Sequence, residues 1–443
     1  MALWLYNGVI LLLSPLLVLY LLRRYISGKS REGWAERWGK LPSALHAQPG
    51  SPPRLWIHAV SAGEVVAAVP ILKELRARFP HHTFLFSVIT PAGYEMATQQ
   101  ALPCVDALFY APLDFPLVVR RVVSIVRPEI YVSLESEIWP NLLHFLKRSG
   151  CQTVMVNGRI SERSFQRSVK VQWLFQWAIG NIDRLLVQSE ADARRVRSLG
   201  GLSESDGVRV QVLGNSKFDQ ALHKLSAPEI QALRSELKLP SSAPIFVAGS
   251  TRSPEEEAVI FDAYRQMQSS FPDLCLLVAP RQIDRAEEVQ ETMRKVGLHP
   301  IRRTELETAN APVQHLILDT MGELANVYAV GAFAYVGNSL PPVVKGGGQN
   351  LLQPLAHGMP VLFGTHTATI RSEVQLVSEQ GVGFVVQDAN EIAERGLEFL
   401  RNPEAREAIG RRATELMAQQ RGVSSRYADA VYALWQEKGN ERH

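Results

Sequence analysis

Glu64 is the first residue whose type and position point to chemistry. It follows an apolar run, Leu55 to Ala59, with the length of a buried strand, and a small-residue turn, Ser61 to Gly63. Apolar residues then recur at helical spacing from Val65 to Arg78. A strand, a short loop and a helix open a doubly wound α/β domain, which binds ligands at this edge of its sheet. The helix dipole favours an ionised Glu64, which can act as a general base; alternatively, this glutamate only complements the dipole.

Other charged side chains follow later predicted strands of the first half. Glu135 and Glu137 come directly after the apolar run Ile130–Leu134. In an extended chain their side chains point to opposite sides, so we expect only one carboxylate to face a ligand. The alternative is that both are solvated or hold a loop through backbone amides. Lys217 adds a cation after the last predicted strand of this half.

A glycine-rich loop marks the second half. Residues Gly337 to Asn350 follow a predicted strand and precede a predicted helix, Leu351 to His357. Gly346 to Gly348 allow the backbone to approach a ligand, and the helix start favours a phosphate. No Gly-Lys-Ser/Thr sequence follows the glycines, so the loop is not a P-loop. A second predicted helix opens at Asp319 to Leu324.

The elements that must position these residues alternate between buried strands and helices. This alternation predicts parallel sheets covered by helices. The pattern restarts after a charged stretch, Ala221 to Pro244, which indicates two α/β domains with a cleft between them. An amphipathic last helix, roughly Ser424 to Glu437, is expected to pack back on the first half. The predicted strands are Leu55–Ala59, Thr83–Ile89, Ala107–Tyr110, Ile130–Leu134, Thr153–Asn157, Leu185–Gln188, Val208–Leu213, Ile245–Gly249, Leu274–Ala279, Leu316–Leu318, Phe333–Val336, Pro360–Phe363 and Gly383–Val386.

The amino-acid composition limits which kinds of ligand and partner are expected. The net charge of +3 over 443 residues is too small to indicate a nucleic acid. No Cys/His cluster has metal-ligand spacing, so no metal is expected. The cysteines, Cys104, Cys151 and Cys275, are odd in number and far apart, which fits a reducing compartment.

The amino terminus differs from the rest. Ala2 to Leu22 carries no charge, is about long enough to cross a bilayer, and is followed by Arg23 and Arg24. The position of these arginines predicts a single anchor with the domains on the cytoplasmic side. A cleaved signal peptide is the alternative, and Pro15 leaves open a helix that dips in without crossing. The Trp-bearing segment Arg31 to Gly39 is suited to a membrane surface or is a solvated connecting helix.

Taken together, these stretches resemble the Kdo (3-deoxy-D-manno-octulosonic acid) transferases of lipopolysaccharide assembly, and the order and spacing of the motifs make the match specific. The family-like stretches are Arg31–Gly39, His58–Glu64, Leu134–Asn141, Asn157–Ser164, Gly214–Asp219, Ala248–Thr251, Pro280–Arg281, Asp319–Leu324 and Gly347–His366. The resemblance implies a metal-independent, membrane-anchored glycosyltransferase with two Rossmann-like domains facing across a cleft, the GT-B type. It implies inverting transfer of Kdo from CMP-Kdo to the lipid A precursor (lipid IVA) at the cytoplasmic face of the inner membrane.

The resemblance also assigns roles to residues. Glu64 matches the family's general base, and Glu135 and Lys217 match residues that steady the transition state. No cofactor beyond the donor is implied. The positions that match those holding CMP are Pro280, Arg281, Met321, Gly322, Glu323, Asn350, Leu351, Leu352 and Gln353.

The sequence departs from the family pattern around the expected nucleotide site. Gln349 and Gln282 stand where His is usual, Gln353 where Glu is usual and Thr369 where Asn is usual, and Pro341 to Lys345 lengthen the glycine loop. Gln still accepts hydrogen bonds through its carbonyl oxygen but carries no charge. Two alternatives to Kdo transfer follow: a paralogue using another nucleotide sugar or acceptor, or a catalytically silent glycolipid-binding relative.

The resulting domain expectation has three parts. Residues 1–24 form the anchor helix, residues 25–220 an acceptor domain, and residues 221–443 a nucleotide-sugar domain whose last helix packs on the first domain.

Overall fold

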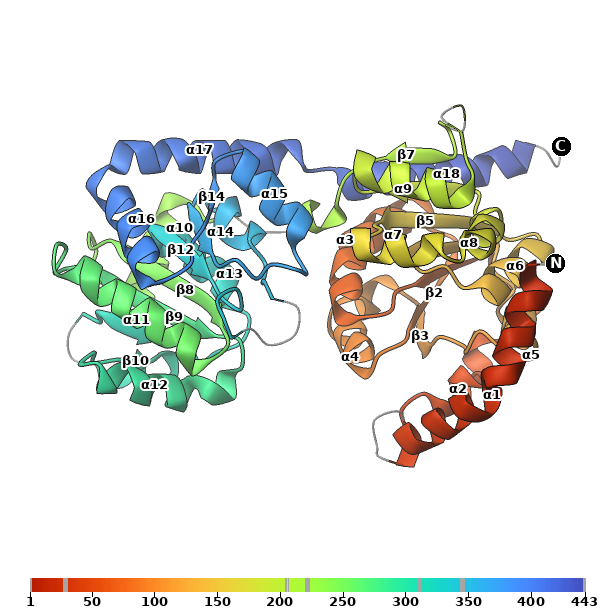
Figure 1. The fold of residues 1–443 in the computed structure, drawn as a ribbon, viewed down its shortest axis with the longest axis horizontal. Coiled ribbons are helices and arrows are strands. Elements are labelled where there is room, and N and C mark those ends of the chain that lie inside the picture. Colours follow the sequence, from red (N-terminus) through yellow and green to blue (C-terminus); the bar gives the residue numbers. More distant parts are fainter. Residues whose placement is uncertain are drawn as a thin grey trace. The chain divides into compact units, whose positions relative to one another are not determined.

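The computed structural model describes residues 2–26, 31–203, 205, 207–219, 224–309, 312–342 and 347–440, without the side chains of 17, 20–22, 24, 439 and 440. The chain forms two compact units (Figure 1). The first unit comprises residues 1–220 and 420–443, and the second comprises residues 221–419. Gly346 and Val343 to Lys345 of the predicted glycine loop lie outside the described residues.

The first unit contains a fully parallel sheet in the order β3-β2-β1-β4-β5-β6-β7. Its central strands are buried on both faces, which explains their unbroken apolar runs. The strands are β1 (Arg54–His58), β2 (Thr83–Val88), β3 (Ala107–Tyr110), β4 (Ile130–Leu134), β5 (Gln152–Gly158), β6 (Arg184–Val187) and β7 (Val210–Val212).

Helices cover both faces of this sheet. The helices are α1 (Ala2–Ile26), α2 (Trp34–Arg37), α3 (Ala62–Arg78), α4 (Pro91–Gln100), α5 (Pro116–Val126), α6 (Pro140–Arg148), α7 (Glu162–Val169), α8 (Gln172–Ile179), α9 (Glu190–Gly200) and α18 (Val423–Asn440). Alternate side chains of β1 belong to two different hydrophobic cores. Leu55 and Ile57 pack with α3, α4 and α18, whereas Trp56 packs with α5, α6, α8 and α9.

The second unit repeats the design. Its parallel sheet has the order β10-β11-β9-β8-β12-β13-β14. The strands are β8 (Ile245–Thr251), β9 (Cys275–Pro280), β10 (Ile301–Arg302), β11 (His315–Ile317), β12 (Phe333–Val336), β13 (Val361–Phe363) and β14 (Gly383–Val385). The helices are α10 (Ala227–Glu236), α11 (Pro254–Gln268), α12 (Ala286–Lys295), α13 (Leu324–Val327), α14 (Leu352–Ala356), α15 (Arg371–Glu379), α16 (Ala389–Arg401) and α17 (Pro403–Gln419).

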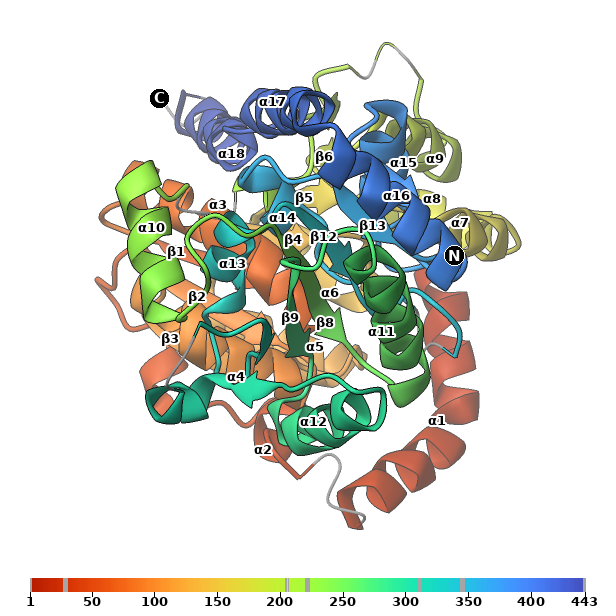
Figure 2. The same cartoon turned by 90° about the vertical axis from the view of Figure 1, so that its left-hand side faces the viewer.

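The helices of this unit also lie on both faces of its sheet. Figure 2 shows α11 and α16 on one side of β8 and β9 and α10 and α13 on the other. The two buried clusters follow the same division, with Phe261 and Phe399 in one and Leu237 and Val327 in the other.

Each sheet therefore has one point where the strand order reverses. In the first sheet it lies between β1 and β4, and in the second between β8 and β12. Ligands of doubly wound folds bind beside the carboxyl ends of the strands at this switch point. The two switch points are thus where the fold places a site in each unit.

The last helix, α18, belongs to the first unit. Its residues Val423, Tyr427 and Val431 are buried in the core beside α3. Asp219 accepts hydrogen bonds from the backbone N–H groups of Gly422 (2.7 Å) and Ser424 (2.5 Å), so the start of α18 is held by the segment that follows β7.

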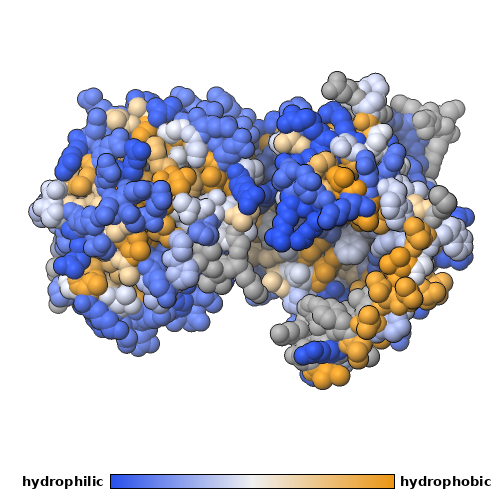
Figure 3. Space-filling model, in the orientation of Figure 1, coloured by the Kyte–Doolittle hydropathy of each residue, from blue (hydrophilic) through white to orange (hydrophobic). Residues whose placement is uncertain are grey.

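The amino-terminal helix α1 presents a mainly apolar surface (Figure 3). Trp4, Leu12 and Leu16 are 84%, 79% and 68% exposed. Among the described residues, however, no helix is long and apolar enough to cross a membrane.

Two polar residues dock α1 on the first unit. The Tyr6 hydroxyl donates to Asp114 Oδ2 (3.0 Å), and the amides of Asn7 and Asn141 exchange hydrogen bonds (3.0 and 2.8 Å). Burial raises the pKa of Asp114 to about 6, against hydrogen bonds from the backbone N–H groups of Asn141 and Leu142. Tyr6 and Asn7, which interrupt the apolar run in the sequence, thus fix the helix beside the loop that follows β4.

The Trp-bearing segment that follows α1 packs on the first unit. Trp38 stacks on Phe115 with 5.6 Å between ring centroids. Glu36 accepts a hydrogen bond from the backbone N–H of Tyr110, and Glu32 accepts one from its hydroxyl. The segment therefore also carries acidic side chains, and these are not simply solvated, because the carboxylates of Glu32 and Glu36 both bind Tyr110 at the end of β3.

Candidate active site

Glu64 lies in the first turn of α3, at the switch point of the first sheet. It is 9% exposed. The backbone N–H of Val60 donates to Glu64 Oε2 (2.7 Å), and the Ser61 hydroxyl donates to Oε1 (3.0 Å). The loop after β1 thus holds both carboxylate oxygens in place.

The protonation of Glu64 differs from the sequence-based expectation of a simple ionised carboxylate. Burial and the nearby charge of Glu135 raise its pKa to about 8, and the charge of Glu137 adds to the rise. The hydrogen bonds from Val60 and Ser61 oppose the shift without cancelling it. A carboxylate with a raised pKa is a stronger base once ionised, which suits proton abstraction from a hydroxyl near neutral pH.

Glu135 and Glu137 lie in the loop after β4 at the same switch point. The chain is not extended at Glu135, which has φ 53°, so the alternation expected of an extended chain does not apply here. The Glu135 backbone N–H donates to Val156 on β5 (3.0 Å). Burial raises the pKa of Glu137 to about 7, although Trp139 Nε1 donates to Glu137 Oε2 (2.8 Å). Both charges act on Glu64, so the two glutamates and Glu64 form one carboxylate cluster.

The segment that carries Lys217 is tied to the same region. The Ser216 backbone N–H donates to Asn157 Oδ1 (3.0 Å), and its hydroxyl donates to the Ala67 carbonyl of α3 (2.9 Å). The Lys217 backbone N–H donates to Asn215 Oδ1 (3.0 Å). Lys217 is therefore fixed between the end of β5 and the helix that bears Glu64.

Asn157 is a site residue whose importance sequence reasoning missed. It is the last residue but one of β5, has φ 53° and is fully buried, and its Nδ2 has no hydrogen-bond partner among the described residues. A buried unsatisfied amide costs free energy, so its retention needs a reason. The only sequence signal was an Asn-Gly pair at a strand end.

The predicted donor residues lie in loops at the carboxyl edge of the second sheet. Pro280 ends β9, and the Arg281 backbone N–H donates to the Thr251 carbonyl of β8 (2.8 Å). Met321 is 79% exposed and Gly322 has φ 85°. Glu323 accepts from Arg303 Nη2 (3.2 Å). Arg281 and Met321 are exposed, and the stretch Asp319 to Leu324 leads into α13, as expected from the sequence.

The remaining donor residues surround the start of α14. Asn350 precedes the helix, and its Oδ1 accepts a hydrogen bond from the backbone N–H of Leu352, the first residue of α14 (2.9 Å). Leu351 and Leu352 are buried, so their side chains belong to the core, and Gln353 is half-buried. Because α14 has only five residues, its dipole is weaker than that of the longer helix predicted from Leu351 to His357.

The glycines of the loop are required by the packing of the chain itself. A Cβ at Gly347 would lie 2.2 Å from the His366 carbonyl oxygen, and one at Gly348 would lie 2.5 Å from Ile370. The Thr369 hydroxyl donates to the Gly347 carbonyl (2.6 Å). The predicted reason, close approach of a ligand, is therefore not needed to explain Gly347 and Gly348.

Two adjacent buried glutamates organise the donor loops, and sequence reasoning missed both. Glu256 accepts hydrogen bonds from the backbone N–H groups of Arg252 (3.1 Å), Asn338 (2.9 Å) and Ser339 (3.1 Å), and from the Tyr335 hydroxyl (2.9 Å). These bonds join the ends of β8 and β12 across the switch point.

Glu257 binds Arg285, which follows β9, and Thr251, which ends β8. Arg285 donates to both of its carboxylate oxygens (2.9 Å each), and the Thr251 hydroxyl donates to Oε1 (2.8 Å). Burial raises the pKa of Glu257, against the bonds from Arg285. In the sequence, three glutamates follow one another from Glu255 to Glu257, and residue type does not distinguish the two buried members from the exposed Glu255.

Comparison with known proteins identifies relatives over nearly the whole chain. A model described as 3-deoxy-D-manno-octulosonic-acid transferase (kdotransferase) matches residues 32–220. The chain is 33% identical over 431 residues to a 3-deoxy-D-manno-octulosonic acid transferase of Haemophilus influenzae, covering 96% of this chain and 97% of that protein. It is 29% identical to the protein of the same name from Bordetella pertussis, covering 95% and 96%.

A solved structure with the same two-unit fold has a different chemistry. The UDP-GlcNAc 2-epimerase of Neisseria meningitidis aligns with a TM-score of 0.59 at 11% identity, covering 85% of this chain and 99% of that one. At this identity the likeness concerns the fold alone.

Proposed function

Because the chain belongs to the family of 3-deoxy-D-manno-octulosonic acid transferases, and is a glycosyltransferase, we propose that it moves Kdo from CMP-Kdo to the lipid A precursor lipid IVA in lipopolysaccharide synthesis. The observation that carries the proposal within the structure is the cluster of Glu64, Glu135 and Glu137 at the first switch point. Its mutual repulsion and burial produce the raised pKa that a general base for a hydroxyl needs.

In the proposed reaction the acceptor hydroxyl attacks the anomeric carbon of Kdo. Its proton passes to the ionised Glu64 carboxylate as the new C–O bond forms. The bond from the anomeric carbon to the phosphate oxygen of CMP breaks, and CMP leaves with the electron pair. Attack opposite the leaving group inverts the anomeric carbon. Glu135 and Lys217 would steady the charges of this transition state, as the family resemblance implies.

The second unit would hold the CMP part. Support comes from the position of the candidate residues, which lie in loops at the carboxyl edge of a doubly wound sheet. Residues proposed to contact CMP are Pro280, Arg281, Met321, Gly322, Glu323, Asn350, Leu351, Leu352 and Gln353, with backbone groups only from the two buried leucines.

A second candidate function has one specific observation in its favour. Gln353 is half-buried and neutral at a position where the family usually has Glu, and Gln282 and Gln349 replace His. These substitutions favour transfer from another nucleotide sugar by a paralogue with the same base.

We further propose that the enzyme works at the cytoplasmic face of the inner membrane. The exposed apolar side chains of α1 would rest in the bilayer surface, as in an interfacial helix. The bonds from Tyr6 to Asp114 and from Asn7 to Asn141 hold α1 beside the loop that carries Glu135. A lipid acceptor would then reach Glu64 from the membrane surface.

A direct test separates the donor from its alternatives. The purified full chain is incubated with lipid IVA and CMP-Kdo, and the product is identified by mass spectrometry. Titration calorimetry with CMP, UMP, GMP and AMP measures nucleotide preference. We expect a Kdo-bearing product and tightest binding of CMP; preferential binding of another nucleotide, without Kdo transfer, would support the paralogue.

A further inference from the structure

A basic hollow lies at the edge of the first sheet opposite to Glu64. It has a volume of about 510 Å³. It is built by the later turns of α5 and α6, the residues that lead into β4, and the end of α18. Its polar lining includes Arg120, Arg127, Glu129, Arg148 and Lys438, and Val123, Pro128 and Phe145 add apolar surface. We call this site the basic hollow.

Two cations of the basic hollow have no counter-ion. Within the described part of the chain, the guanidinium groups of Arg120 and Arg148 make no ion pair or hydrogen bond. Arg127 Nε donates only to the Ser124 carbonyl (3.1 Å). The lining carboxylate, Glu129, accepts from Trp435 Nε1 (3.4 Å). The hollow therefore gathers positive charge that the protein itself does not neutralise.

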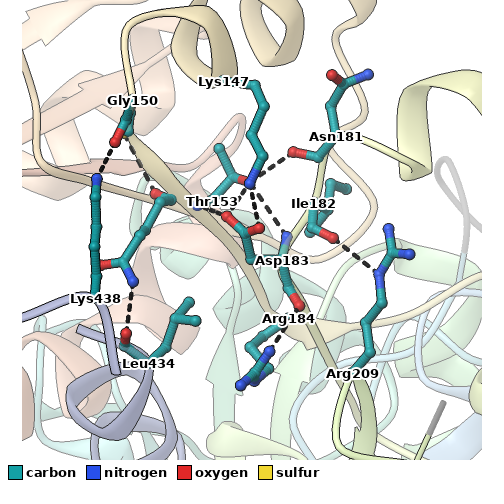
Figure 4. Close-up of polar contacts among 12 residues, drawn as sticks. Lys147, Gly150, Thr153, Asn181, Ile182, Asp183, Arg184, Arg209, Leu434 and Lys438 are labelled. Atoms are coloured by element: carbon teal, nitrogen blue, oxygen red, sulfur yellow. Dashed lines mark hydrogen bonds and ion pairs between the residues drawn. The ribbon is translucent and has the colours of Figure 1, made fainter. Parts of the chain in front are cut away.

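An adjoining hollow differs from the basic hollow in the pairing of its cations. It shares Gly150 and Lys438 with the basic hollow and has a volume of about 380 Å³. Its other cations are paired: Lys147 with Asp183, and Arg184 with Glu437 (2.6 Å). Figure 4 shows this neighbourhood, with Lys147 beside Asp183 and Lys438 donating to the Gly150 carbonyl. Of these two adjoining hollows, the basic hollow is therefore the one lined by arginines without an ion pair among the described residues.

A purely structural role explains only part of the charge. Cations in the last turn of a helix interact favourably with its dipole, which accounts for Arg148 at the end of α6. The same interaction accounts for Lys438 in the last turn of α18, but not for Arg120, which lies in the second turn of α5. Arg127 ends α5 with φ 47°, where glycine is usual, so a strained arginine occupies the rim of the hollow.

We propose that the basic hollow binds a small phosphate-bearing molecule. Arg120, Arg127 and Arg148 would receive the phosphate, because guanidinium groups match phosphate oxygens in geometry and charge. The organic part of the ligand would lie against Val123 and Phe145.

The fold favours a ligand from solution over a lipid. Asp114 and Asn141, which dock α1, lie at the amino ends of α5 and α6, whereas the hollow lies toward their carboxyl ends. Along the axis of α5, Arg127 lies about 16 Å beyond the first residue, Pro116, and Arg120 lies about 6 Å beyond it. The contacts that dock α1 are therefore at the opposite end of α5 from Arg127, so a bilayer held by those contacts does not meet that end of the hollow.

The test uses the full chain with saturating CMP, so that the proposed nucleotide site is filled. Calorimetry with phenyl phosphate and with inorganic phosphate should show saturable binding, tighter for phenyl phosphate because of Phe145. The double substitution Arg120→Gln with Arg148→Gln should weaken phenyl phosphate binding at least about tenfold. Arg121→Gln, a neighbour on α5 that does not line the hollow, is the matched control and should bind as the wild type does.

Three results would overturn the proposal. One is the absence of saturable binding to the wild type. Another is equal binding by the double variant, which would place the ligand elsewhere. In the third, phosphatidylglycerol vesicles, but not phosphatidylcholine vesicles, displace phenyl phosphate, which would assign the site to a lipid headgroup. Unchanged thermal midpoints, and unchanged sugar transfer without phenyl phosphate, establish that the variants are folded and that the proposed transfer function is tested separately.

Discussion

At the scale of the residue, the pKa of Glu64 is set by its burial, by the charges of neighbouring carboxylates and by its hydrogen bonds. Its stretch of sequence indicated a carboxylate at a ligand-binding edge, and the structure places it there. That Glu135 and Glu137 both act on it could not be predicted, because the positive φ of Glu135 cannot be read from residue type. Whether side chains from neighbouring loops at a sheet edge lie close together depends on such local backbone conformations.

Glu64→Gln should reduce sugar transfer at least about a hundredfold, because the amide retains the size of the side chain but cannot accept the proton. Steady-state transfer with both substrates measures the loss, and calorimetry checks that CMP binding is unchanged. Glu95→Gln, an exposed glutamate on α4, is the control and should transfer normally. Near-wild-type transfer by Glu64→Gln would remove this residue from the role of base.

Transfer should also depend on pH through Glu64. Only the ionised form accepts a proton, so the rate should rise about tenfold per pH unit below about pH 8 and level off above it. A rate profile over pH 6 to pH 10, at saturating substrate, tests this expectation.

The stability of the fold should show the opposite trend in the same pH range. The folded pKa of Glu64 is raised from 4.5 to about 8, so the folded state binds more protons than the unfolded state between these values. The contribution of Glu64 to the free energy of unfolding is therefore lost as pH rises toward 8. Denaturant titrations should show a smaller decrease with pH for Glu64→Gln; equal slopes for both proteins would contradict the raised pKa.

At the scale of the element, the strands were predictable and the buried charges were not. Strands buried on both faces produce apolar runs, so every predicted strand is present within a few residues of its expected bounds. β10 was missed because it has two residues, one of them Arg302. Glu256 and Glu257 were missed because a helix start rich in glutamate is usually solvated, and burial depends on which loops pack above it.

Glu256→Gln should weaken donor binding more than it slows chemistry. The new amide group would face backbone N–H groups that now donate to the carboxylate, so the loop after β12 should lose its position. Each hydrogen bond to a charged group contributes about 1.5–3 kcal/mol, so the free energy of unfolding of the second unit should also fall by an amount of that order. The KM for the donor should rise severalfold with a smaller change in kcat.

Glu255→Gln is the matched control for this substitution, because the residue lies in the same helical turn but is exposed. Rescue of the KM by Glu256→Asp, even in part, would indicate positioning by the carboxylate. A loss of stability in Glu256→Gln without any change in the KM for the donor would show that the residue is only structural.

At the scale of the whole molecule, α1 is attached to the first unit chiefly through side chains at its surface. Removing residues 1–24 deletes the partners of Asp114 and Asn141 from α1, but Asp114 keeps its bonds from the backbone N–H groups of Asn141 and Leu142 (3.0 and 2.8 Å). The truncated chain should therefore stay folded and become more soluble, while losing binding to phospholipid vesicles. Circular dichroism and vesicle co-sedimentation measure the two properties; unfolding of the truncated chain would show that α1 is part of the core.

The return of α18 to the first unit has a consequence for how the protein is made. A ribosome releases residues 1–220 long before residues 420–443, so the core beside α3 lacks Tyr427 and Val431 throughout synthesis of the second unit. The second unit, being continuous, can finish folding first. Asp219, two residues after Lys217, has no Ser424 to bind until the second unit has been synthesised. The first unit therefore acquires α18, and with it this partner of Asp219, only after every residue of the second unit has been made.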